Sequence, residues 1–193
     1  ASSKEIGAAA RHIIAYDSKN GEQIWKLSRE ELKTLVPLSL CAEGKRVFYL
    51  DSNQLHCLDA ENVKELWASD AKTSGTFIRS YAPTVVVKDG VVLFLTTAES
   101  KAFSAESGDE LWTNRGSIGF GSPADLFAID GKFWLLTMSY DRSVARPGRK
   151  TSFKPHKAVA LDIRTGEIAN TLPFKPNQHH HRCFRNKATA NCI

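Results

Sequence analysis

The 193-residue sequence has little of several features that usually point to a function. No apolar run approaches the roughly 20 residues that a membrane-spanning helix needs, so no such helix is predicted. The four cysteines show neither a CxxC spacing nor a vicinal pair, which leaves no redox or zinc signature among them. No phosphate-binding loop, activated nucleophile or complete metal motif occurs. We therefore expect the sequence to determine architecture more clearly than activity.

The composition is that of an ordinary globular chain, with 42% hydrophobic and 24% charged residues and a formal net charge of +5. Cys41 and Cys57 stand in apolar stretches and are expected to behave as small buried hydrophobic residues. Cys183 and Cys192 could form a disulfide in an oxidising compartment. The sequence leaves that pairing open.

One sequence motif occurs four times along the chain. Its first copy begins Ala15-Tyr16-Asp17, continues through Gly21-Glu22 and ends at Trp25. The later copies end at Trp67, Trp112 and Asn170, at spacings of 42, 45 and 58 residues. A repeat of this length is typical of the blades of a β-propeller.

Each copy reads as two strands joined by a tight turn. The Asp can accept hydrogen bonds from backbone N–H groups of the turn, and the Gly supplies a positive φ. Copy two has Val63 in the Gly position, and we expect Asn62 to take the left-handed conformation instead. Copy three has Ser104 in the Asp position. The residues predicted to build the repeat are Asp17, Gly21, Trp25, Asp59, Trp67, Gly108, Trp112, Asp162 and Gly166.

A second set of turns lies between the first set, at Gly44, Asp89-Gly90 and Asp130-Gly131. An apolar run follows each turn, which is the pattern of a hairpin with a two-residue connection. Two hairpins per repeat make a four-stranded antiparallel sheet. The sequence therefore predicts an all-β fold, a β-propeller in which the recurring Trp packs between neighbouring blades.

These motifs resemble the repeat of the PQQ-repeat propellers, the quinoprotein alcohol dehydrogenase-like superfamily. The resemblance runs from about Arg11 to Leu172 and implies a fold whose members usually have eight blades. Members include quinone-dependent dehydrogenases and also binding propellers, such as the scaffold lipoprotein of the outer-membrane assembly machine. The stretch His179 to Thr189 also resembles a segment of large, uncharacterised PQQ-repeat proteins of planctomycete-type bacteria.

The repeat spacing gives about four blades and, at residues 178–193, the start of a further blade, so residues 1–193 are predicted to form a single partial propeller domain. Four blades of an eight-bladed disc form a half ring with open strand edges. We expect these edges to be completed by the remainder of a larger chain or by a second copy. A closed four-bladed disc is the less favoured alternative.

The repeat is interrupted by a basic insertion. Gly131 to Asn170 spans 39 residues, whereas Gly44 to Trp67 spans 23, so about sixteen residues are added near Ser139 to His156. From Arg142 onward the sequence has eleven Lys or Arg and two acidic residues. This segment therefore has a net charge of +9, which leaves a net charge of −4 for residues 1–141. This segment is a candidate site for an anionic ligand, or a solvated loop. Nucleic acid is disfavoured because no aromatic residues are interleaved with the charges.

A second departure from the repeat is the cluster His179-His180-His181-Arg182-Cys183. In a strand His179, His181 and Cys183 would share one face and could contribute to a zinc or copper site. An anion pocket and a packed or solvated strand are the alternatives. Strand order predicts that this cluster and the basic insertion project from the same end of the propeller. The residues proposed for a ligand or anion are Arg146, Arg149, Lys150, His180, Arg182 and Arg185.

The function that these features favour is a recognition or scaffold module of a larger extracytoplasmic protein, which binds a partner or an anionic ligand. The alternative is a PQQ-dependent dehydrogenase-like or metal-dependent enzyme domain that uses the His179–Cys183 cluster. The resemblance implies that such a dehydrogenase would hold PQQ and calcium with a Trp platform, Glu, Asn and Asp. These residues cannot be matched one by one here, and catalytic residues stay unassigned. Family habit implies a periplasmic or extracellular location.

Overall fold

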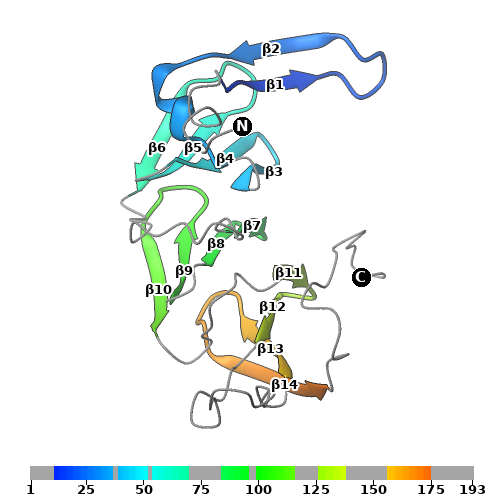
Figure 1. Ribbon diagram of the computed structural model, residues 1–193, viewed down its shortest axis with the longest axis vertical. Helices are drawn as coiled ribbons and strands as arrows, with labels where there is room; N and C mark the ends of the chain where they lie inside the picture. Colours follow the sequence, from blue (N-terminus) through cyan, green and yellow to red (C-terminus); the bar gives the residue numbers. More distant parts are fainter. Residues whose placement is uncertain are drawn as a thin grey trace, which may run out of the picture. The chain divides into compact units, whose positions relative to one another are not determined.

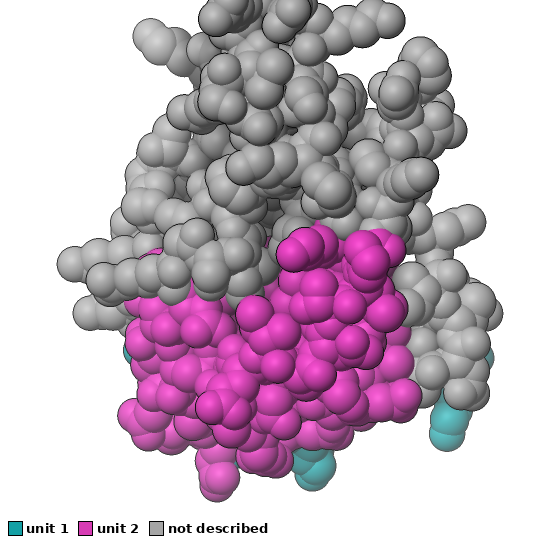
Figure 2. All heavy atoms as spheres, turned by 90° about the horizontal axis from the view of Figure 1, so that it is seen from below, with its two compact units in different colours: residues 1–76 teal, residues 77–193 magenta. Residues whose placement is uncertain are grey.

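The structure, a computed structural model, describes residues 11–36, 39–51, 54–69, 84–95, 99–115, 126–137 and 156–174. All regular elements in these ranges are β-strands, apart from the short 3-10 helix η1 (Glu30–Thr34). In the same ranges no helix is long and apolar enough to cross a membrane. The chain divides into two compact units, residues 1–76 and 77–193, which Figure 2 distinguishes by colour.

The first unit contains a two-stranded and a four-stranded antiparallel sheet. The strands of the first sheet are β1 (Ile13–Tyr16) and β2 (Gln23–Leu27). The strands of the second sheet are β3 (Cys41–Glu43), β4 (Arg46–Leu50), β5 (Leu55–Asp59) and β6 (Glu65–Ser69). The turn motif places β1 and β2 in the positions of β5 and β6, so the first sheet holds the outer half of a repeat.

The second unit contains two four-stranded antiparallel sheets with the strands in chain order (Figure 1). The third sheet consists of β7 (Thr84–Lys88), β8 (Val91–Leu95), β9 (Glu99–Ser104) and β10 (Glu110–Arg115). The fourth sheet consists of β11 (Leu126–Ile129), β12 (Lys132–Thr137), β13 (His156–Asp162) and β14 (Ile168–Phe174). The predicted all-β fold of four-stranded antiparallel blades is confirmed, and about four blades are present.

The first turn of each sheet in the second unit is the predicted two-residue hairpin. Asp89 and Gly90 have φ of 51° and 76°, and Asp130 and Gly131 have φ of 50° and 66°. Two successive positive φ values define a type I′ turn, whose twist matches that of the flanking strands. Asp-Gly meets this requirement because both residues tolerate the left-handed region.

The third turn has the same hydrogen bonds in every copy. Asp17 Oδ1 accepts the backbone N–H of Lys19 at 2.7 Å, and Asp162 Oδ1 accepts that of Arg164 at 2.8 Å. In copy three the Ser104 hydroxyl accepts the N–H groups of the turn at 3.2 and 3.3 Å. Serine therefore replaces aspartate without a change in turn type, because both side chains have an oxygen that can accept hydrogen bonds from the backbone N–H groups of the turn.

The prediction for Asn62 is wrong, because Val63 itself adopts the left-handed conformation, with φ of 63°. The Val63 N–H donates to the Asp59 carbonyl at 2.9 Å, just as the Gly21 N–H donates to the Asp17 carbonyl at 2.8 Å. Val63 also packs with Trp25 against the core of the first unit. The hydrogen-bond frame and this packing together hold a β-branched residue in a region that normally favours glycine.

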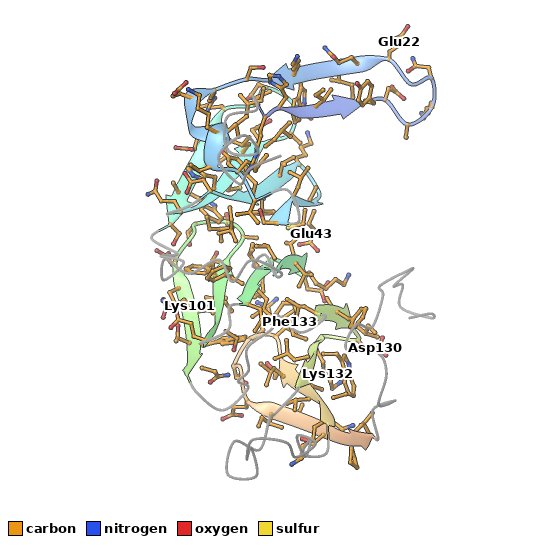
Figure 3. All side chains as sticks on the ribbon, in the orientation of Figure 1. Glu22, Glu43, Lys101, Asp130, Lys132 and Phe133 are labelled. Atoms are coloured by element: carbon orange, nitrogen blue, oxygen red, sulfur yellow. The ribbon has the colours of Figure 1, made fainter. Side chains whose placement is uncertain are left out.

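Each unit has a hydrophobic core between its two sheets. In the first unit Ile13 and Leu27 pack with η1 residue Leu32 against Val47, Tyr49 and Leu58. In the second unit the side chains come from β8, β9, β11, β12, β13 and the turn after β13, and Figure 3 labels Phe133 on β12 as one of them. The members of that core are Val91, Leu93, Leu95, Ala102, Leu126, Phe133, Leu135, Val159, Leu161 and Ile163. Both cores are formed by face-to-face packing of sheets, as in neighbouring propeller blades.

Candidate functional site

The residues predicted to bind a ligand or metal lie outside the described residues. They are Arg146, Arg149, Lys150, His179, His180, His181, Arg182, Cys183 and Arg185. Residues 178–193, predicted to begin a further blade, lie outside them as well.

The structure does place the strand ends to which the two predicted ligand segments are attached. The basic insertion follows β12 and precedes β13, and the histidine cluster follows β14. Thr137 at the end of β12 pairs with Lys157, and His156 at the start of β13 pairs with Phe174 at the end of β14. Three neighbouring strands of one sheet therefore meet the two segments at a single end. The tight turns at Gly131 and Gly166 lie at the other end.

Two of the recurring Trp residues join neighbouring sheets within a unit. The Trp25 indole N–H donates to the Ala60 carbonyl at 2.7 Å, and the Trp112 indole N–H donates to the Ile163 carbonyl at 3.1 Å. Ala60 and Ile163 each follow the Asp of a third turn. The same donor and acceptor positions thus connect the first sheet to the second and the third sheet to the fourth.

The Trp112 indole lies over a glycine of the fourth sheet. A Cβ atom added to Gly166 would be 2.6 Å from Trp112 Cδ2. The Asn114 side-chain amide donates to the Gly166 carbonyl at 2.8 Å, so β10 makes a second polar contact with the same turn. The socket for the indole is therefore a bare glycine next to backbone acceptors.

Three of the four Trp side chains make contacts with neighbouring residues of the sheets. Trp25 and Trp112 direct their indole N–H groups to backbone carbonyls between sheets, and the Trp67 ring is 5.8 Å from that of Phe48. In the described ranges no group of three or more His, Cys, Asp or Glu side chains could hold a metal ion. We derive no chemistry through PQQ or a metal from these residues.

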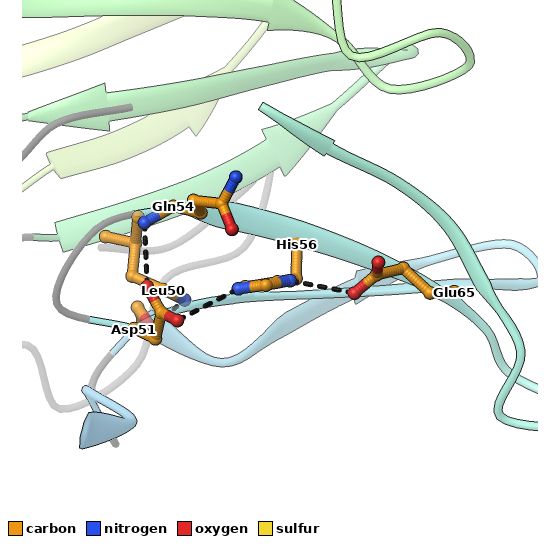
Figure 4. A network of polar contacts seen from close by, with 6 residues as sticks. Leu50, Asp51, Gln54, His56 and Glu65 are labelled. Atoms are coloured by element: carbon orange, nitrogen blue, oxygen red, sulfur yellow. Dashed lines mark hydrogen bonds and ion pairs between the residues drawn. The ribbon is translucent and has the colours of Figure 1, made fainter. Parts of the chain in front are cut away.

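The described part of the chain does contain a buried polar network that the sequence did not reveal (Figure 4). His56 on β5 is 5% exposed and lies between two carboxylates. Its Nδ1 is 2.9 Å from Glu65 Oε2, and its Nε2 is 3.2 Å from Asp51 Oδ2. The second contact has an ion-pair distance, but its angles do not meet those of a hydrogen bond. Tyr49 stacks on the imidazole with ring centroids 4.7 Å apart.

The network ties three strands of the second sheet together. Asp51 is also fixed by the turn, since its Oδ1 accepts the Gln54 N–H at 2.7 Å. The one available signal was a histidine inside an otherwise apolar strand. Nothing in the sequence indicated which acids would face it, because pairing across strands decides that.

The two described cysteines are free thiols that flank one aromatic residue. Cys41 on β3 and Cys57 on β5 both pair with Phe48 on β4. Burial raises the pKa of Cys41 to about 12, and Glu43 adds to the rise. Burial likewise raises the pKa of Cys57 to about 11. Such thiols are poor nucleophiles and metal ligands at neutral pH, because the thiolate is the reactive form.

Two solved structures are similar in fold. BamB from Moraxella catarrhalis aligns with a TM-score of 0.51 and 17% identity, over 83% of this chain and 58% of that one. Quinohemoprotein alcohol dehydrogenase from Comamonas testosteroni aligns with a TM-score of 0.58 and 18% identity, over 83% of this chain and 32% of that one. At these identities the likeness shows the fold alone. The chain spans about three fifths and one third of the two proteins.

A comparison with curated proteins finds no match. A comparison with protein families matches residues 9–184 to the family described as outer membrane protein assembly factor BamB. The match covers the whole repeat region, from Arg11 to Leu172. The chain therefore belongs to this family of PQQ-repeat β-propellers.

Proposed function

We propose that the chain is a recognition module of a larger extracytoplasmic protein, and that it binds an anionic ligand or partner at one end of its sheets. The observation that carries this proposal is the register at the ends of β12, β13 and β14. Because Thr137 pairs with Lys157 and His156 with Phe174, the strand ends that lead into the basic insertion and toward the histidine cluster are neighbours in one sheet. We infer that the two segments, which both depart from the repeat and follow neighbouring strand ends, share a role.

The charge distribution supports an anion as the ligand. Residues from Arg142 onward have a net charge of +9, against −4 for the preceding residues. A local excess of this size raises the concentration of anions at that surface and speeds their association. The Asp residues of the repeat do not contribute to such a site, since Asp17 and Asp162 carry a negative charge and accept backbone hydrogen bonds in their turns.

Binding to heparin, used as a model polyanion, tests the proposal. We expect the affinity of the chain to fall about ten-fold when Arg146, Arg149 and Lys150 are changed together to Gln, and to fall with rising salt. A matched control changes Lys19, Lys26 and Lys64 to Gln, which are exposed and lie in the first unit. An equal loss in both triple variants would mean that net charge, and not this segment, determines binding.

A further inference from the structure

The turn between β1 and β2 contains a reactive dipeptide, Asn20-Gly21. In the four copies of the motif the residue before the left-handed position is Asn20, Asn62, Ser107 and Thr165, and only the first copy joins Asn to Gly. No other Asn in the sequence precedes a Gly. This turn is therefore the one place in the sequence where a side-chain amide is followed by the backbone nitrogen of a residue without a Cβ atom.

An Asn-Gly pair can lose its amide without an enzyme, because no Cβ atom hinders the approach of the glycine nitrogen to the side-chain carbonyl carbon. The Gly21 nitrogen attacks Asn20 Cγ, a C–N bond forms, and the Cγ–Nδ2 bond breaks. Ammonia leaves with the proton of the Gly21 N–H, and a succinimide ring remains. Water then opens the ring at either carbonyl and gives aspartate or isoaspartate. The reaction consumes only water and replaces a neutral amide by a carboxylate.

The dipeptide is accessible to water. Asn20 and Gly21 are both exposed, and Figure 3 labels their neighbour Glu22 at the tip of the same hairpin. A Cβ atom added to Gly21 would have no heavy atom within 4 Å, apart from its own chain neighbours. Burial therefore does not protect Asn20 from this reaction.

The closed turn engages both reacting groups in hydrogen bonds. The Gly21 N–H donates to the Asp17 carbonyl at 2.8 Å, so the proton that must leave is held. Asn20 Oδ1 accepts the Glu22 N–H at 2.9 Å, and Asn20 Nδ2 donates to Glu22 Oε2 at 3.1 Å. The reaction requires a turn in which these bonds are broken. Its rate therefore follows the population of that open state.

We propose that Asn20 is a modification site at which the side chain deamidates spontaneously, and that opening of the β1–β2 turn sets the rate. The products loosen the turn permanently. An aspartate at this position has no N–H to donate to Glu22, and its carboxylate repels that of Glu22. An isoaspartate lengthens the main chain between Asp17 and Gly21, which the closed turn joins by one hydrogen bond.

The second sheet supplies a matched control at Asn62. Asn62 Oδ1 accepts the Lys64 N–H at 2.9 Å, and the Val63 N–H donates to the Asp59 carbonyl at 2.9 Å, so the hydrogen bonds of the two turns correspond. Asn62 is exposed, as Asn20 is. The branched side chain of Val63 crowds the backbone nitrogen, so we expect Asn62 to react at least about ten-fold more slowly than Asn20.

Mass spectrometry of proteolytic peptides measures how much of each Asn has become an acid in the intact chain at mildly alkaline pH. We expect Asn20 in the folded chain to convert about ten-fold more slowly than in a synthetic peptide of residues 15–25, because local opening of an exposed turn is frequent. Equal rates in chain and peptide overturn the proposal. No conversion of the chain after about ten half-lives of the peptide also overturns it.

Substitutions of Asp17 connect the rate to the turn. Asp17 Oδ1 accepts the Lys19 N–H at 2.7 Å, so Asp17→Ala should open the turn more often and speed the conversion of Asn20 about five-fold. Asp17→Ser should keep the wild-type rate, because Ser104 supports the corresponding turn of the third sheet. A D17A rate equal to that of the wild-type chain, or a D17S rate as high as that of D17A, overturns the proposal.

A third variant creates the site in the other turn. Val63→Gly makes the Asn-Gly pair in the second sheet within a corresponding set of hydrogen bonds, and we expect Asn62 in V63G to convert within about three-fold of the rate of Asn20. Absence of conversion at Asn62 in V63G overturns the proposal. Conversion of Asn62 in the wild-type chain as fast as that of Asn20 does so as well, because the glycine would then have no part in the reaction.

Discussion

Trp112 and Gly166 lie against each other across two sheets, so closely that a Cβ atom on the glycine would be 2.6 Å from the indole ring. Glycine is therefore required at position 166 for two reasons: its φ of 73° is left-handed, and the indole leaves no room for a side chain. Gly21 needs only the first property, since a Cβ atom there would meet nothing within 4 Å. The two glycines form a natural pair for separating backbone strain from steric overlap.

Gly166→Ala is expected to destabilise the chain by about 2 to 5 kcal/mol, the sum of left-handed strain and overpacking. Gly21→Ala should cost only the strain, about 1 to 2 kcal/mol. Urea unfolding followed by Trp fluorescence measures both values. Equal losses in the two variants would mean that the indole moves aside without cost.

Val63→Gly is expected to change the free energy of unfolding by less than about 1 kcal/mol, because relief of left-handed strain offsets the loss of a half-buried side chain. Val47→Ala in the same core should cost about 1 to 3 kcal/mol, since Val47 sits in a β-strand and has no strain to release. Denaturant midpoints of both variants decide the matter. A loss at Val63 as large as that at Val47 would show that its φ carries no penalty.

His56→Ala should destabilise the second sheet by about 2 to 3 kcal/mol, because it removes the buried imidazole that lies 3.2 Å from the Asp51 carboxylate and hydrogen-bonds Glu65. Glu65→Gln should cost less than about 1 kcal/mol, because the Glu65 side chain is 41% exposed and water screens its charge. A double-mutant cycle with Asp51→Asn measures the coupling. We expect the loss at His56 to shrink when Asp51→Asn is already present, and an unchanged loss would assign it to the stacking on Tyr49.

The pH dependence at the alkaline end is expected to come from Cys41 and Cys57. Their pKa values are raised from 9.0 to about 12 and about 11, so between these limits the folded chain binds more protons than the unfolded chain. Stability should therefore fall as the pH rises above about 9. Cys41→Ala and Cys57→Ala variants, unfolded at pH 8 and pH 10, should show a smaller difference than the wild-type chain. The same burial predicts slow alkylation of both thiols at pH 8 until denaturant is added.

At low pH, Asp162 provides a second test of the pH dependence of stability. The N–H groups of Thr165 and Arg164 lower the pKa of this carboxyl from 3.8. A lowered pKa means that its stabilising effect is present above the ordinary value and is lost as the pH falls through the folded value. Asp162→Ser copies the turn found at Ser104 and should reduce this acid dependence while keeping the turn. Melting temperatures between pH 2 and pH 6 measure the difference.

Much of the fold was predictable because the residues of each turn are enough to determine its conformation. Asp-Gly at 89–90 and 130–131 fixes a hairpin locally, and the Asp and Gly of the third turn do the same. Val63 shows the limit of that reasoning, since the local preference pointed to Asn62 and the hydrogen-bond frame of the turn prevailed. The His56 network was out of reach, because Asp51 and Glu65 meet the imidazole only when β4, β5 and β6 are paired.

By itself the sequence determined the repeat, its strand count and its turn types, since each depends on residues within a few positions of one another. Only the tertiary structure decided that Trp112 covers Gly166 while no indole of the described ranges covers Gly21, and that a histidine lies between two acids. Those relationships depend on which sheet faces which, and the packing of faces is set by side chains that are far apart along the chain.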